Sequence, residues 1–138
     1  MKKIFSFTLI GTYLLPLFIF SQDEFADAVK YKLKLDRETL RGGEVISLTA
    51  DLKIKKEYHI YASNPDMSLS PSYFEWEDSS SFSRVGIMIE PEPKSKYDPM
   101  FEMEVGFHKG SVQLRQDLQL TENLKPGNYS LNGTFIYR

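Results

Sequence analysis

Apolar and polar residues alternate along most of this chain, and this alternation constrains its fold more than any other feature. The stretch "VKYKLKL" at 29–35 sets four apolar or aromatic side chains against three lysines, and "VISLTADLKI" at 45–54 continues the same period. Successive side chains point to opposite faces in an extended strand, so a period of two predicts half-buried β-strands. The pattern returns in "SYFEW" at 72–76, "VQLRQDLQL" at 112–120 and "YSLNGTFIY" at 129–137.

Turn residues separate these stretches, and the sequence after the amino-terminal region shows no helical stripe of ten or more residues. About seven or eight short strands with regular turns predict a single all-β sandwich domain. The segment "EPEPKSKYDP" at 90–99 holds three prolines, which predicts a loop and excludes a central strand. The tripeptide "HKG" at 108–110 ends in a glycine that suits a hairpin between the flanking strands.

The amino terminus has the layout of a secretory signal peptide. "MKK" is followed by the apolar run "IFSFTLIGTYLLPLFIF" and by the small residue Ser21, before polar "QDEFAD". The alternative is a membrane anchor. At 17 residues, with Gly11 and Pro16 inside it and no basic cluster after it, the run is short for a span. We therefore expect a leader of residues 1–21, cleaved near Ser21, and an exported domain of residues 22–138 in the periplasm or cell envelope.

Composition narrows the function of the exported part. Without Lys2 and Lys3 the chain keeps 15 basic and 19 acidic residues, a formal charge of −4, and no basic stripe, which argues against nucleic acid as a partner. The sequence has no cysteine, so it forms no disulfide and no thiolate metal site. Its two histidines, His59 and His108, lack the spacing of a metal pair. We expect no metal and no cofactor, and a packing or surface role for each histidine.

Carboxylates two positions apart could act as an acid and base pair, because such residues share one face of a strand. A glycosidase would need them across a cleft, whereas solvated strand faces are the simpler interpretation. The pairs are Glu75 with Glu77, Glu90 with Glu92, and Glu102 with Glu104.

Three segments, in this order, resemble one family. They are "KIKKEYHIYASNP" at 53–65, "EPEPKSKYDPMFEMEVGFHKGSVQLRQDLQL" at 90–120 and "GNYSLNGTFIYR" at 127–138. Together they resemble the amino-terminal periplasmic domain of the thiol:disulfide interchange protein DsbD, the disulfide bond corrector domain, over residues 26–138. The resemblance implies an immunoglobulin-like β-sandwich.

The family transfers electrons with two cysteines, the first of which comes soon after a strand of the "TFIYR" type. The resemblance therefore implies that the chain stops before the expected cysteine pair, beyond Arg138, and that the last strand or strands are missing. Exchange requires a thiolate, so these 138 residues are expected to be redox-inactive as given, and whether they form an enzyme stays open. The implied partners are periplasmic thioredoxin-like oxidoreductases and a membrane electron-transfer domain.

The resemblance also assigns site residues. The family covers its cysteines with a cap loop that bears an aromatic residue, and "YDPMFEMEV" at 97–105 matches it, with Phe101 as the cap aromatic and Asp98 in the same loop. Tyr58 and Tyr61 match the aromatic strand that borders the family's redox site. From the residues alone, ordinary core packing explains large rings equally well.

A second hypothesis is a non-catalytic β-sandwich that binds a protein or glycan at the cell envelope. Exposed Trp76, Tyr73 and Phe101 would then form the binding patch.

Overall fold

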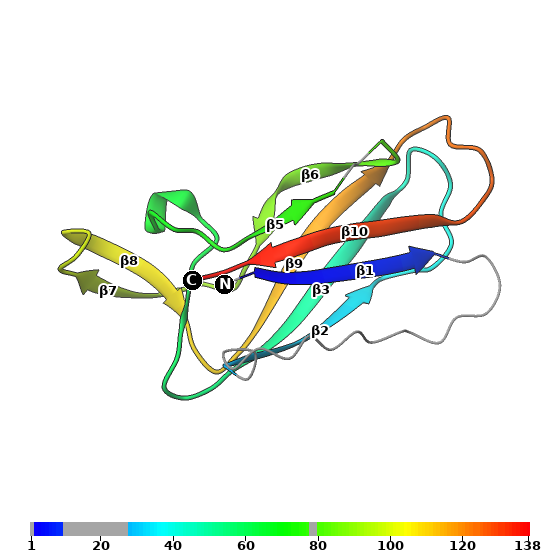
Figure 1. The fold of residues 1–138 in the computed structure, drawn as a ribbon. Helices are drawn as coiled ribbons and strands as arrows, with labels where there is room; N and C mark the ends of the chain where they lie inside the picture. The colour runs from blue at the N-terminus through cyan, green and yellow to red at the C-terminus, as the bar shows by residue number, and fades with distance from the viewer. Residues whose placement is uncertain (1, 10–27, 78–79) are drawn as a thin grey trace.

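The computed structural model describes residues 2–9, 28–77 and 80–138, with side chains described in the last two ranges. These residues form β-strands joined by turns and one short 3-10 helix, η1, which confirms the predicted all-β class (Figure 1). The elements are β1 (Lys2–Leu9), β2 (Val29–Leu35), β3 (Val45–Ile54), β4 (Ile60–Tyr61), η1 (Pro65–Met67), β5 (Tyr73–Trp76), β6 (Phe82–Ile89), β7 (Lys94–Asp98), β8 (Met103–His108), β9 (Ser111–Leu120) and β10 (Tyr129–Ile136).

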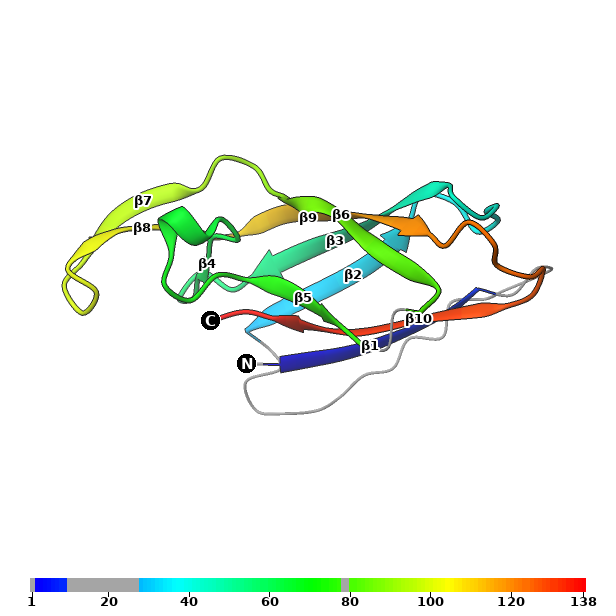
Figure 2. The ribbon, with the colours of Figure 1, turned by 90° about the horizontal axis from the view of Figure 1, so that it is seen from above.

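Two antiparallel layers make up the sandwich. One sheet has the order β2-β3-β9-β6 and the facing sheet has the order β1-β10-β5 (Figure 2). A third, small sheet of order β4-β8-β7 lies beyond one end of the two layers (Figures 1 and 2). The predicted sandwich is therefore present, with one additional element at its end.

The alternating sequence pattern places the sandwich strands accurately. The strands β2 and β3 have the bounds of the predicted stretches 29–35 and 45–54. Along β3, the apolar side chains from Ile46 to Ile54 are buried at every second position. In β10 the same period buries Leu131, Gly133 and Phe135. One face of β3 and one face of β10 are thus removed from water, and such burial is the main favourable contribution to folding.

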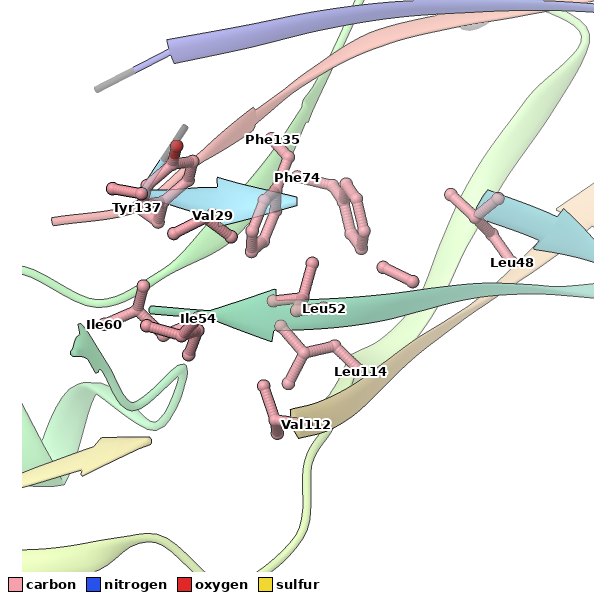
Figure 3. Packing of buried hydrophobic residues seen from close by; sticks show 12 residues of the cluster. Val29, Leu48, Leu52, Ile54, Ile60, Phe74, Val112, Leu114, Phe135 and Tyr137 are labelled. Carbon is pink, nitrogen blue, oxygen red and sulfur yellow. The ribbon is translucent and has the colours of Figure 1, made fainter. Parts of the chain in front are cut away.

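The core lies between the two layers. Phe74 on β5 and Phe135 on β10 face the aliphatic side chains of β3 and β9, such as Leu52 and Leu114 (Figure 3). The two phenyl rings have centroids 4.9 Å apart. A second buried cluster contains Ile46, Phe82, Leu118 and Leu131. Both sheets contribute to each cluster, so the apolar contacts hold the layers together.

Two local predictions are wrong. The segment 90–99 is not a loop throughout, because Lys94–Asp98 forms β7. Its three prolines lie outside that strand, and among the described strands β7 pairs only with β8, as an edge strand. The tripeptide at 108–110 does not close a hairpin, because β8 and β9 belong to different sheets. Gly110, at a φ of 71°, instead lets the chain turn from one sheet into the other.

The amino-terminal strand β1 pairs along β10, from Lys2 opposite Ile136 to Leu9 opposite Tyr129. Both edges of β10 are therefore paired, by β5 and by β1. The predicted cleavage near Ser21 and most of the apolar run lie outside the described residues, so the leader stays a prediction. β1 falls within that leader, so cleavage would remove it and leave β10 paired with β5. Among the residues that the structure does describe, no helix has the length and apolar character to span a bilayer.

Candidate functional site

The strands β7 and β8 form a hairpin, residues 94–108, that projects from one end of the sandwich (Figure 1). No residue of β7 is fully buried, and within the described chain neither apolar cluster of the sandwich includes a residue of β7 or β8. The projecting hairpin is attached through β8, which pairs with the two residues of β4. The last residues after β10 reach the same end of the molecule (Figures 1 and 2).

A tight turn at the tip of the projecting hairpin directs Phe101. The Asp98 carboxylate accepts a hydrogen bond from the backbone N–H of Met100 at 2.9 Å, and Glu102 adopts a left-handed φ of 53°. Met100 points into solvent with 84% of its surface exposed, whereas Phe101 is half-buried. The Phe101 ring lies edge-on to Tyr61, with centroids 6.2 Å apart and an interplanar angle of 65°. The turn therefore holds an aromatic ring against β4.

Tyr61 on β4 connects the hairpin tip to the end of the chain. Its hydroxyl donates a hydrogen bond to the Asp98 carboxylate at 3.3 Å, and its backbone N–H donates to the carbonyl of Arg138 at 2.9 Å. Burial raises the pKa of Tyr61, and the charge and hydrogen bond of Asp98 raise it further. Tyr61 is therefore a neutral phenol in the physiological range.

Three of the four site residues implied by the resemblance thus meet: Phe101, Asp98 and Tyr61. The fourth, Tyr58, lies in the turn before β4 and is 44% exposed. None of the ring contacts between described residues joins it to Phe101 or Tyr61.

His59 lies next to Tyr61 instead. Its ring is edge-on to Tyr61, with centroids 5.6 Å apart, and to Phe107, with centroids 5.5 Å apart. The Lys96 ammonium is 3.3 Å from His59 Nε2, and Lys96 and Lys109 both lie over the Phe107 ring. Burial lowers the pKa of His59, and the charges of Lys96 and Lys109 lower it further. His59 is therefore a neutral ring packed within the aromatic group.

The site contains a buried polar pair that the sequence reasoning missed. Glu90 Oε2 lies 2.8 Å from His108 Nε2 and accepts the backbone N–H of Ser63 at 2.8 Å, while Oε1 accepts the N–H of Asn64 at 3.0 Å. The side chains of Glu90 and His108 are only 10% and 6% exposed. The prediction of solvated carboxylate pairs is therefore wrong for Glu90, and of the two roles expected for His108, packing or surface, its burial favours packing.

Hydrogen bonding keeps Glu90 ionised. Burial by itself raises the pKa of this carboxyl, but the hydrogen bond from His108 and those from Ser63 and Asn64 outweigh it and bring the pKa below its ordinary value. No sequence motif marks the pair, because Glu90 and His108 stand 18 positions apart and meet only when the hairpin folds.

Two further expectations concern metals and aromatic patches. Within 28–77 and 80–138, no group of three or more His, Asp or Glu side chains could hold a metal ion. Tyr73 is 40% exposed, but Trp76 packs against both buried clusters, with its ring tilted against Phe74 and edge-on to Phe82. Trp76 is thus not the exposed aromatic that the binding-module hypothesis requires.

These features define a class of domain, an all-β sandwich that carries an aromatic hairpin beside the end of β10. The sequence model of the family described as "Thiol:disulfide interchange protein DsbD, N-terminal" matches residues 27–136. The chain belongs to this family. No curated protein and no solved structure matches the chain.

Proposed function

We propose that residues 22–138 are the scaffold and cap of an exported thiol:disulfide interchange domain, whose cysteine pair follows Arg138 in a longer gene product. One observation carries this proposal. Tyr61 contacts the tip of the projecting hairpin through Phe101 and Asp98, and it binds the carbonyl of Arg138 through its backbone. The hairpin tip and the exit of the chain after β10 are therefore held by one residue.

The distance along the chain supports this placement. In the family the first cysteine comes soon after a strand of the "TFIYR" type, and here that strand leads to Arg138 beside β4. Consecutive Cα atoms are about 3.8 Å apart, so a cysteine within the next few residues stays within reach of Tyr61 and Phe101. In this position the projecting hairpin would cover the sulfurs.

The proposed reaction is a transfer of two electrons to an oxidised partner, a thioredoxin-like oxidoreductase. A thiolate of the domain attacks one sulfur of the partner's disulfide, which forms a mixed disulfide and releases a partner thiolate. The second cysteine then attacks the domain's sulfur in the mixed disulfide. The partner leaves as a dithiol and the domain is left with a disulfide. A membrane electron-transfer domain would reduce that disulfide again.

The residues of this chain would control access to the sulfurs. The rings of Phe101 and Tyr61 exclude water and small oxidants while the hairpin is closed, and the partner displaces the hairpin when it docks. Tyr61 also remains a neutral hydrogen-bond donor to Asp98, which holds the tip of the hairpin in place.

Export supports the same proposal. The amino-terminal sequence has the charged, apolar and small-residue order of a signal peptide. Disulfides persist in oxidising compartments outside the cytosol, where an exported reductant has substrates.

The gene sequence beyond codon 138 provides the first test. We expect two cysteines shortly after Arg138, followed by membrane spans of about 20 apolar residues each. A stop codon with no downstream cysteine would overturn the redox assignment.

The full-length protein provides the second test. In its reduced form, Phe101→Ala should raise the rate of reaction with a small disulfide reagent about tenfold, the effect of some 1.4 kcal/mol in the closing equilibrium. Met100→Ala is the matched control, because Met100 lies in the same turn and points into solvent. Equal rates in both variants would show that Phe101 is not a cap.

A further inference from the structure

We propose that Glu90 and His108 form a latch that holds the projecting hairpin closed, and that they are positioning residues for the thiol exchange proposed above. The effect of the latch on thiol:disulfide exchange rests on the proposed function. The latch itself depends only on described residues and can be tested in a chain without cysteines.

The pair lies at the base of the projecting hairpin. Glu90 follows β6 and stands four positions before the first residue of β7, while His108 is the last residue of β8. Their bond of 2.8 Å therefore joins the entry of the hairpin to its exit. The same carboxylate binds the backbone of Ser63 and Asn64, which follow β4. Three chain segments thus meet at one side chain.

Proton donors surround the carboxylate. Both oxygens of Glu90 accept backbone N–H groups, so the carboxylate acts as an acceptor and His108 Nε2 must carry the proton between the pair. A buried carboxylate with three such donors is well satisfied, but the loss of any one of them leaves a polar group unpaired. The latch therefore depends on each of its three hydrogen bonds to Glu90.

The rest of the hairpin's attachment runs through β8, whose residues Val105–His108 are buried. β4 pairs with β8 through Ile60 with His108 and Tyr61 with Phe107, and the Ala62 N–H after β4 donates to the Gly106 carbonyl at 2.9 Å. Gly106 of β8 lies so close to the side chains of Ala62 and Met67 that a Cβ atom at this position would crowd them. Because the two apolar clusters include no residue of β7 or β8 within the described chain, the latch should act on the hairpin and not on the core.

Native-state amide hydrogen exchange of the chain tests the latch. Glu90→Gln keeps the size of the side chain but replaces one acceptor oxygen by an NH₂ group that faces an N–H donor. We expect the β7–β8 amides to exchange about tenfold faster, the effect of some 1.4 kcal/mol. Amides of β3 and β9 should keep their protection.

The matched control is Glu92→Gln, a carboxylate two positions along the same segment that is exposed to solvent. It should leave the exchange of the hairpin unchanged. If Glu90→Gln and Glu92→Gln gave the same hairpin exchange, the latch would be wrong. It would also be wrong if the β3 and β9 amides lost as much protection as the hairpin, because the pair would then be a general core contact.

Substitutions of His108 give an independent test should Glu90→Gln fail to fold. His108→Gln can still donate an N–H to Glu90, so it should restore most of the hairpin protection, whereas His108→Leu leaves the carboxylate without this donor. Faster hairpin exchange in His108→Leu than in His108→Gln supports the latch. Equal exchange in the two variants overturns it.

The full-length protein can test whether opening the latch changes the reactivity of the thiols. There Glu90→Gln should raise thiol reactivity in the same direction as Phe101→Ala. Faster hairpin exchange with unchanged thiol reactivity in both variants would refute the cap, and with it the positioning role. Higher reactivity in Phe101→Ala alone would keep the cap and refute the positioning role of Glu90.

Discussion

The sandwich and the projecting hairpin are stabilised in different ways. The sandwich buries alternate side chains of both sheets in two apolar clusters. The hairpin has a β7 without fully buried residues; it is attached through the buried end of β8 and through the bonds of Glu90 with His108 and of Tyr61 with Asp98. Apolar burial is non-directional and spread over many residues, whereas a polar contact can open by itself. The comparison shows how one domain can combine a stable body with an element that opens at lower free energy.

The strongest test of the comparison removes part of the sandwich core. Leu114 on β9 is fully buried, and Leu114→Ala should lower the free energy of unfolding by about 2–5 kcal/mol. The whole domain should lose stability, as measured by urea denaturation. Leu69→Ala is the control, because Leu69 is 63% exposed. A loss below about 1 kcal/mol in Leu114→Ala would contradict a core of this kind.

A smaller effect should follow from changing where β8 approaches the sandwich. A Cβ atom on Gly106 would lie 3.0 Å from the Cβ of Ala62 and 3.1 Å from Met67 Cε. Gly106→Ala should therefore cost about 1–2 kcal/mol, mainly as faster hydrogen exchange of the hairpin.

A double variant checks the cause of that loss. Met67→Ala removes one of the two crowded neighbours, so its combination with Gly106→Ala should cost less than the sum of the two single changes. Additive costs would indicate that the contact with Met67 does not limit the approach of β8.

Lowering the pH should destabilise the hairpin before it destabilises the sandwich. The pKa of Glu90 lies below its ordinary value of 4.5, so its contribution to stability is present above that pH and is lost as pH falls through the lower folded value. In wild-type protein the hairpin amides should lose protection in this range before those of β3 and β9, after correction for intrinsic exchange rates. Glu90→Gln should lack this transition. If it kept the same acid transition, another carboxyl would be responsible.

The smallest expected effect concerns the tip of the hairpin. Asp98→Asn removes the charge that helps raise the pKa of Tyr61, so this pKa should fall toward 10.0 while burial still holds it above that value. A pH titration of the Tyr61 ring by NMR measures the change. The pKa of Tyr31, which burial alone raises, is the internal control and should not move. An unchanged Tyr61 would mean that Asp98 does not contact it in solution.

Local patterns predicted the sandwich well, since the alternation that places a strand also says which face is buried. The resemblance, carried by residues 97–105 and 53–65, named Phe101, Asp98 and Tyr61, which contact one another in the structure, whereas it did not name His59, which packs against Tyr61. The hairpin strand β7 was missed because the prolines around it outweighed its short polar pattern. Its pairing with β8 depends on contacts outside the segment itself.

By itself, the sequence determined the all-β class, the strand faces, the membership of the family and the absence of cysteine from these 138 residues. These properties depend on composition and on neighbours within a few positions. Only the tertiary structure decided that β8 and β9 belong to different sheets, that Tyr61 joins the hairpin tip to Arg138, and that Glu90 is buried against His108. Such contacts join residues far apart in the chain, and their geometry exists only after the two layers and the hairpin have packed.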